Sequence, residues 1–371
     1  MATPRRPPTL LLLAWTGILC ACGQGAGLPP EEVVKVPGQG TVVVYVEAPR
    51  RIAGPVLKTF EEQTGIHVDA NYRENLGDRF LSTLMSRAGQ GTVDLFWGET
   101  PLSAYEMVEA GLAVPFRPAG ARPVPGQYRD HDFRWIGFAV NPRVIIYNSA
   151  ALKKKEEAPT ETTDLVKPPW AGKGAMPRIA AGPAAFHATA LFMLWGPERA
   201  RAFFESLRTN GTRIVEDDRA VRQLVAAGAA QWGMIGLDQA ICAKREAEPI
   251  NILFPDRLGI GAIVPPQLVM LLRGAPSGAQ AKGLFGYLFA TESGWVLGQN
   301  DCALLTLLPD IPRPDWVPAA GAFNIAQVDP EAAWKTYREN SAYFTSWGAE
   351  QAPAAAPTSQ PRAALSPLPP P

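Results

Sequence analysis

Polar side chains that could bind a small ligand follow four apolar, strand-like segments of the sequence. Arginine pairs with carboxylate or phosphate groups through two parallel N–H donors. Carboxylates can instead face a cation, and hydroxyl, amide or imidazole groups can fix a ligand by hydrogen bonds. In open parallel sheets, the loops at the carboxyl ends of the strands line the ligand cleft, so we expect these residues to share one site. They are Glu47, Arg50, Arg51, Glu99, Thr100, His187, Asp238 and Gln239.

Several of these residues have a second interpretation. Arg50 and Arg51 can be ordinary solvated surface charges. Glu99 stands before a predicted helix and can cap it instead of contacting a ligand. His187 is either a core residue or a donor to a bound anion. The chain has three histidines and none at the spacing of metal ligands, so a zinc site is not expected.

The elements that must position these residues alternate between strand-like and helix-like segments. A β-branched run such as residues 41–46 is typical of a buried parallel strand, and Gly65 is a favoured residue at a helix end. This alternation predicts an α/β fold, with mainly parallel sheets covered by helices. We expect strands at 41–46, 66–72, 93–97, 136–140, 144–147, 178–181, 213–215, 234–237, 258–264 and 268–272, and helices at 54–64, 76–85, 102–111, 186–195, 197–207, 219–227 and 279–297.

The composition of the chain and its lack of catalytic motifs argue against two functional classes, nucleic-acid-binding proteins and enzymes. The 371 residues include 35 Lys and Arg against 35 Asp and Glu, so the net charge is zero. Without a global positive field, nucleic acid is not an expected partner. The sequence has no Gly-x-Ser-x-Gly elbow, Walker loop or His-Glu-x-x-His motif, so we do not expect an enzyme.

The N-terminal residues predict export and attachment to a membrane, and both ends of the chain are predicted to lie outside the folded body. Residues 1–21 read as a signal peptide that ends in a motif resembling the bacterial lipobox, with Cys22 as the lipidated residue. An ordinary secretory signal is the alternative. Residues 22–40 read as a flexible tether, and residues 349–371 as a disordered tail rich in Pro and Ala. Outside the signal peptide, no apolar run approaches 18 residues, so we expect the protein to contact the membrane through the lipid alone.

Six segments in order resemble the ferric-iron-binding type of solute-binding protein that serves ABC importers. The resemblance covers about residues 41–309, and Gly236-Leu237 and Gly274-Ala-Pro276 also fit it. Because the six segments occur in the same order as in that family, they make a more specific resemblance than a match to any single segment would. They are VVVYV (42–46), FEEQTGI (60–66), VDLFW (93–97), EAGLAVP (109–115), RVIIYN (143–148) and WAGK (170–173).

The resemblance implies a two-lobed periplasmic-binding fold of class II, with two parallel or mixed sheets flanked by helices and joined by a hinge. The chain would cross between the lobes near residues 134–147 and 259–266. The implied division is lobe 1 at 41–140 plus 262–316, lobe 2 at 141–261, and a C-terminal helical segment at 317–348. The implied partners are an ABC permease and its ATPase. The protein would act as a monomer facing the periplasm or the cell exterior.

The chain departs from the ferric-binding pattern at its expected ligand residues. Such proteins carry two adjacent tyrosines close behind the Gly-Leu pair, whereas Ile241 and Cys242 stand there in this sequence. Glu99 remains a candidate metal ligand by resemblance. We therefore expect a small anionic solute, or a chelate of iron(III) or another metal, as the ligand, and no cofactor. Cys242 and Cys302 either form a disulfide or are two buried thiols.

Two other functions remain open from the sequence. One is a lipoprotein that senses a ligand without transport, and the other is an exported enzyme on the same fold, because a fold does not fix a function. A permease and an ATPase encoded beside this chain would favour import, and a histidine kinase would favour sensing.

Overall fold

The computed structural model describes residues 31–32, 38–121, 124–150, 158–309, 311–312 and 323–349. The predicted signal peptide, Cys22 and nearly all of the predicted tail lie outside these residues. Part of the predicted tether, β1 (Glu31–Glu32), pairs in parallel with β6 (Arg117–Pro118). Among the described helices, none combines the length and apolar character needed to cross a bilayer.

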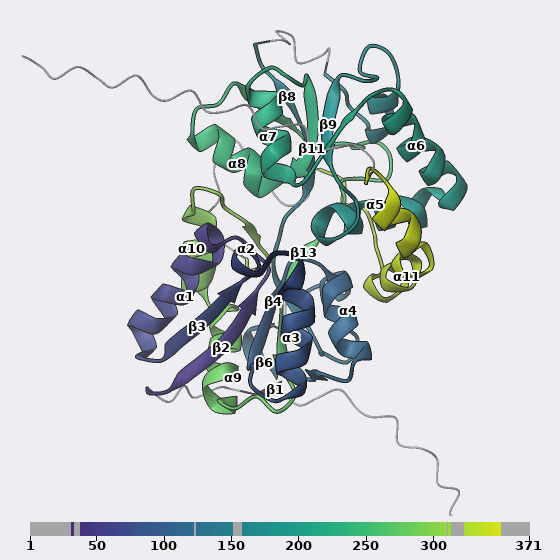
Figure 1. The fold of residues 1–371 in the computed structure, drawn as a ribbon. Coiled ribbons are helices and arrows are strands. Elements are labelled where there is room, and N and C mark those ends of the chain that lie inside the picture. The colour runs from purple at the N-terminus through teal and green to yellow at the C-terminus, as the bar shows by residue number, and fades with distance from the viewer. Residues whose placement is uncertain are drawn as a thin grey trace, which may run out of the picture.

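Two sheets form two lobes, stacked one above the other in Figure 1. The sheet of lobe 1 has seven strands in the order β14-β7-β13-β4-β2-β3, with β5 beside β13. Strands β2, β3 and β4 are parallel, whereas β13 runs antiparallel to β4, β5 and β7. The bounds are β2 (Thr41–Val46), β3 (His67–Tyr72), β4 (Leu95–Gly98), β5 (Ala113–Val114), β7 (Ile136–Val140), β13 (Pro266–Leu272) and β14 (Leu305–Thr306).

Helices cover both faces of this sheet because side chains alternate along its strands. Tyr45 packs into the apolar cluster of α3 and α4, whereas Val44 and Val46 pack into that of α1 and α9. Gly65 ends α1 at a φ of 72°, a conformation that glycine adopts without strain. The bounds are α1 (Arg50–Thr64), α2 (Arg73–Leu76), α3 (Phe80–Gly89), α4 (Pro101–Glu109), α9 (Gly278–Tyr287) and α10 (Thr291–Gln299).

The sheet of lobe 2 has five strands in the order β10-β9-β11-β8-β12. Strands β9, β10 and β11 are parallel, and β8 is antiparallel to both β11 and β12. Its strands are β8 (Arg143–Asn148), β9 (Gly174–Pro177), β10 (Arg213–Val215), β11 (Trp232–Gly236) and β12 (Ile250–Leu253), and its helices are α5 (Gly182–Trp195), α6 (Pro197–Thr209), α7 (Asp218–Ala226) and α8 (Leu237–Arg245).

The chain passes between the lobes directly from β7 to β8, and again between β12 and β13. Backbone N–H groups of Asn141 and Arg143 donate to the carbonyls of Pro265 and Ile263, so the two connections lie side by side. A third passage leads to α11 (Pro330–Ser346), which lies between the lobes beside α4 and α5 (Figure 1). The predicted C-terminal helical segment contains this helix.

Several predicted elements differ from the structure. Both sheets are mixed rather than mainly parallel, because β13 runs antiparallel to its neighbours in lobe 1 and β8 does so in lobe 2. The strand expected at 258–264 is wrong; one bridge, from Ala262 to Ile325, lies there within the connection between lobes. The helices expected within 279–297 are confirmed as α9 and α10. Residues 238–242, expected in a loop, belong to α8, because β11 passes into this helix without an intervening loop.

Candidate functional site

Glu47 is a buried carboxylate at the carboxyl end of β2. Its Oε2 accepts hydrogen bonds from the Glu99 backbone N–H at 2.9 Å and from the Ser103 hydroxyl at 2.9 Å. Burial raises the pKa of the Glu47 carboxyl, and the positive charge of Arg73 opposes that rise. These contacts tie the loop after β2 to the start of α4, so Glu47 also positions Glu99.

Glu99 follows β4 and lies beside two buried carboxylates, Glu47 and Asp238. Burial, together with the negative charges of Glu47 and Asp238, raises the pKa of Glu99 to about 8. The Gln267 amide lies 3.5 Å from Glu99 and is oriented by the Trp97 indole, which donates to Gln267 at 2.9 Å. Glu99 is therefore largely protonated at neutral pH, and a nearby positive charge would favour its ionised form.

Asp238 brings a third carboxylate from lobe 2, in the first turn of α8. Its Oδ1 accepts a hydrogen bond from the Asn141 amide at 2.8 Å, and its Oδ2 accepts one from Gln239 at 3.0 Å. The Asp238 backbone N–H donates in turn to Asn141 at 3.1 Å. Burial and the charge of Asp218 raise the pKa of Asp238. Asn141 lies between the lobes, so this network fixes α8 against the hinge.

Gly236 permits this close approach. A β-carbon at this position would lie 2.6 Å from the Asp238 carboxylate and 2.7 Å from the Asn141 amide. Both distances are shorter than side chains tolerate, so a larger residue would push Asn141 and Asp238 apart. The requirement for glycine here comes from packing, because its backbone is extended, with φ at −71°.

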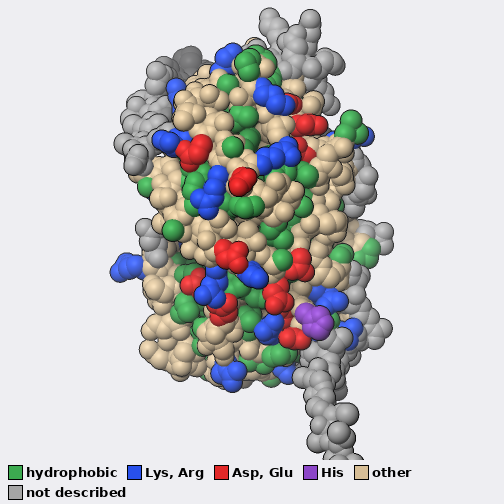
Figure 2. All heavy atoms as spheres, turned by 90° about the vertical axis from the view of Figure 1, so that its right-hand side faces the viewer, with side chains coloured by type: hydrophobic (Ala, Val, Ile, Leu, Met, Phe, Trp, Pro, Cys, Tyr) green, Lys and Arg blue, Asp and Glu red, His purple; other side chains and the backbone are tan. Residues whose placement is uncertain are grey.

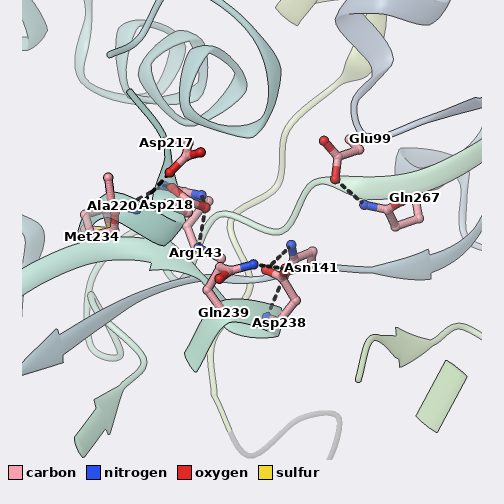
Figure 3. A network of polar contacts seen from close by, with 11 residues as sticks. Glu99, Asn141, Arg143, Asp217, Asp218, Ala220, Met234, Asp238, Gln239 and Gln267 are labelled. Carbon is pink, nitrogen blue, oxygen red and sulfur yellow. Dashed lines mark hydrogen bonds and ion pairs between the residues drawn. The ribbon is translucent and has the colours of Figure 1, made fainter. Parts of the chain in front are cut away.

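Arg143 is a fully buried cation whose charge is already paired. Its guanidinium donates to the Asp218 carboxylate at 2.5 and 3.0 Å, and the Gly236 N–H donates to the same carboxylate. Figure 3 shows this pair beside Asn141 and Asp238, with Glu99 and its Gln267 partner on the other side of the view. Arg143 therefore stabilises the hinge rather than offering a free positive charge.

His187 and Gln239 each carry a buried polar atom without a hydrogen-bond partner among the described residues, Nδ1 and Oε1 respectively. His187 lies in α5 and is 4 % exposed. Burial and the charge of Arg143 lower the pKa of His187 to about 3, so its ring is neutral. A neutral imidazole and an amide oxygen can serve as hydrogen-bonding groups for a ligand.

Arg50 and Arg51 lie in the first turn of α1, rather than in a loop, and both are exposed. The Arg50 guanidinium stacks over the Tyr72 ring at 4.4 Å from its centre. The Arg51 carbonyl accepts a hydrogen bond from Asn300. Their predicted contact with an anion stays a prediction.

A cavity of about 210 Å³ lies between the lobes beside this site; Glu47 lines it, whereas Glu99 and Asp238 are not among its lining residues. Arg73 from α2 approaches the start of α5 within it: a β-carbon at Gly182 would lie 3.5 Å from the Arg73 guanidinium. Thr100, the residue before α4, is buried in the wall, and its side chain makes no capping hydrogen bond. The polar wall consists of Glu47, Arg73, Thr100, Ser103 and Glu106; Gly182, Trp334 and Tyr337 contribute from lobe 2 and α11.

The structure thus brings together Glu47, Glu99 and Thr100 from lobe 1, and Asp238 and Gln239 at the hinge side of lobe 2. Within the described part of the chain, no group of three or more His, Cys, Asp or Glu side chains is arranged to hold a metal ion. The residues expected to replace the tyrosine pair are closed off: Ile241 is fully buried, and Cys242 is bonded to Cys302.

Beyond Glu106 and the residues of α11 that line the cavity, five residues of this site were not predicted from the sequence. Two had a detectable signal: Arg143 is a charge that opens an apolar strand, and Gln267 is an amide inside another. The other three, Arg73, Ser103 and Asn141, look like ordinary surface or turn residues until the lobes are assembled.

Comparisons with known proteins agree with this architecture. A family described as bacterial extracellular solute-binding protein matches residues 94–302. The Fe(3+)-binding periplasmic protein of Serratia marcescens is 31 % identical over 199 residues, which cover 52 % of this chain and 56 % of that protein. The match thus spans little more than half of that relative.

Two solved structures are similar over most of their length. The apo ferric ion-binding protein A of Pasteurella haemolytica has a TM-score of 0.72 at 22 % identity, covering 81 % of this chain and 96 % of that one. The Trichodesmium protein IdiA (FutA) has a TM-score of 0.68 at 18 % identity, covering 83 % and 100 %. These likenesses confirm the predicted two-lobed class II fold. The relatives named here are binding proteins, not enzymes.

Proposed function

Because this chain belongs to the family of bacterial extracellular solute-binding proteins, we propose that it is the lipid-anchored receptor of an ABC importer. The ligand would be held between the lobes and delivered to a permease driven by an ATPase. Export is supported by the periplasmic relative as well as by the predicted signal peptide. The lipid on Cys22 would keep the receptor at the membrane that holds its permease.

The ligand we propose is a chelate of iron(III) or another metal, in preference to the alternative of a free small anion. The observation that carries this choice is the carboxyl of Glu99, whose pKa is raised by burial and by the charges of Glu47 and Asp238. A free anion would meet this negative potential at short range. Arg73 is the one cation among the described residues that line the cavity.

A metal chelate matches both signs of charge in this cleft. Its metal centre can take hard carboxylate oxygen from Glu99 or Asp238, while the carboxylates of the chelator can pair with Arg73. A bare ion is less well supported, because the site lacks both the tyrosine pair and a preformed group of metal ligands among its described residues. The similar Trichodesmium structure is in complex with iron and citrate.

Thermal unfolding with ferric citrate tests the proposed ligand class, since a ligand that binds the folded state raises the melting temperature. We expect ferric citrate to stabilise the protein, citrate alone to do so much less, and Asp238→Asn to reduce the ferric citrate shift. The Arg50→Ala, Arg51→Ala double variant should keep that shift. Stabilisation by citrate alone that disappears in the double arginine variant would contradict the chelate proposal and support a free anion. No shift with ferric citrate would also contradict it.

Lipid anchoring is tested by substituting each of the two cysteines of the signal region, Cys20 and Cys22. Cys22→Ala is expected to move the protein from the membrane fraction to the soluble fraction and to abolish incorporation of labelled fatty acid, because several acyl chains together hold a membrane firmly. Cys20→Ala is the matched control and should leave both readouts unchanged. Membrane retention of the Cys22→Ala variant would show that the anchor is not there.

A further inference from the structure

Helix α11 contacts both lobes and borders the ligand cavity. On lobe 2, the Tyr337 hydroxyl donates to the Ala180 carbonyl at 2.9 Å, and the Trp347 indole donates to the Phe204 carbonyl at 3.2 Å. On lobe 1, the partner is Glu109, at the end of α4. Figure 1 shows α11 between α5 and α4 at the level where the lobes meet.

The two attachments differ in kind. Phe344 and Trp347 are buried against lobe 2, where their rings pack edge-on against Phe192 and Phe204, with ring centres 4.9 and 5.4 Å apart. Buried aromatic packing of this kind is strong and independent of charge. α11 is therefore held firmly to lobe 2.

On lobe 1, Ala333 and Trp334 belong to the apolar cluster that includes α4, and the polar contacts beside them are half-exposed. Glu109 accepts a hydrogen bond from the Trp334 indole at 2.8 Å, and Arg338 donates to both of its carboxylate oxygens at 2.8 Å. The Trp334 and Arg338 hydrogen bonds lower the pKa of Glu109, so it is charged at physiological pH. Figure 2 shows this side of the molecule, with side chains of both charges gathered in its lower half.

Trp334 also lines the ligand cavity, together with Tyr337. Their rings stack with centres 6.0 Å apart and an angle of 25° between their planes. The Trp334 side chain thus lines the cavity and also donates the hydrogen bond to Glu109 of lobe 1. Glu47 and Arg73 form part of the polar wall of the same cavity.

We propose that Trp334 and Tyr337 are ligand-contacting, specificity-determining residues, and that the contacts of Glu109 with Trp334 and Arg338 are a latch that holds the lobes closed over the cavity. The assignment of this cavity to the ligand rests on the proposed function. The latch rests on the contacts alone and can be tested without a ligand.

Distances between the lobes test the latch in the ligand-free protein. Spin labels attached to cysteines at exposed positions Ser82 in α3 and Arg219 in α7 report the separation of the lobes. Glu109→Gln removes the ion pair, and Trp334→Phe keeps a ring but removes the indole donor. Both variants should populate longer distances than the parent. Glu62→Gln breaks a similarly exposed ion pair with Lys58 inside α1 and is the matched control, with no expected change.

Binding of ferric citrate tests the aromatic wall. Because a less populated closed state lowers apparent affinity, Glu109→Gln should weaken binding by roughly 3- to 10-fold. Trp334→Ala, which also removes the ring from the cavity, should weaken it further than Trp334→Phe. Unchanged distance distributions in Glu109→Gln and Trp334→Phe would overturn the latch. Equal affinities of Trp334→Ala and Trp334→Phe would overturn the aromatic wall, whereas failure of the parent protein to bind would overturn the proposed ligand but not the latch.

Discussion

Replacing both Cys242 and Cys302 by serine is expected to lower the free energy of unfolding by about 2–4 kcal/mol. The disulfide joins residues 60 apart in sequence, with their α-carbons 4.5 Å apart, and so restricts the unfolded chain over a long loop. Denaturant unfolding followed by tryptophan fluorescence measures the loss. Reduction of the parent protein should reproduce it, while the double serine variant should not respond to reductant. Equal unfolding midpoints for the oxidised parent and the double serine variant would contradict this stabilising role.

This disulfide also links the two lobes. Cys242 lies in α8 of lobe 2, and Cys302 lies between α10 and β14 of lobe 1. It therefore limits how far these two elements can separate. The double serine variant should show a broader distribution of distances between the labels at positions 82 and 219. A distribution identical to that of the oxidised parent would mean that the hinge alone sets the range of opening.

Much of the fold could be predicted because local patterns decide it. The β-branched run of β2, the glycine at the end of α1 and the apolar face of α7 all occur close to their expected positions. Elements that depend on long-range pairing were harder to predict. β12 pairs with β8, although about one hundred residues separate their paired positions, and the antiparallel direction of β13 depends on its return from the other lobe.

The candidate site was predictable in part for the same reason. Glu47, Glu99 and Asp238 follow strands directly, so their place at the strand ends could be inferred from the sequence. The sign of the electrostatic potential in the site could not be inferred from the sequence, because it depends on which charges are paired. The positive charge of Arg143 is neutralised by the carboxylate of Asp218, which lies 75 positions away in the sequence. The contribution of Trp334 and Tyr337 to the cavity was also not predicted, because α11 comes from a segment beyond the recognised resemblance.

Binding of ferric citrate is expected to strengthen with pH up to about 8, by close to tenfold per pH unit below the pKa of Glu99. The reason is that burial and neighbouring carboxylates raise the pKa of Glu99 to about 8, so the carboxyl must lose a proton before it can contact a metal centre. Calorimetry in buffers of different ionisation enthalpy should detect the released proton. Glu62→Gln is the matched control and should keep the pH dependence of the parent, whereas Glu99→Gln, which lacks the titrating carboxyl, reports the change of the ligand itself with pH.

Glu99→Gln removes this proton release and should bind ferric citrate roughly 10- to 100-fold more weakly at pH 8, since a hydrogen bond or contact with a charged group contributes about 1.5–3 kcal/mol. Without ligand, the sign of the effect reverses. Because the folded-state pKa is raised, the folded protein holds this proton where the unfolded chain loses it, so stability falls as pH rises from about 4.5 to about 8. Glu99→Gln should therefore unfold at a higher temperature than the parent at pH 8, and at nearly the same temperature at pH 4. A variant that binds as tightly as the parent and shows the same dependence on pH would place the metal centre of the ligand away from Glu99.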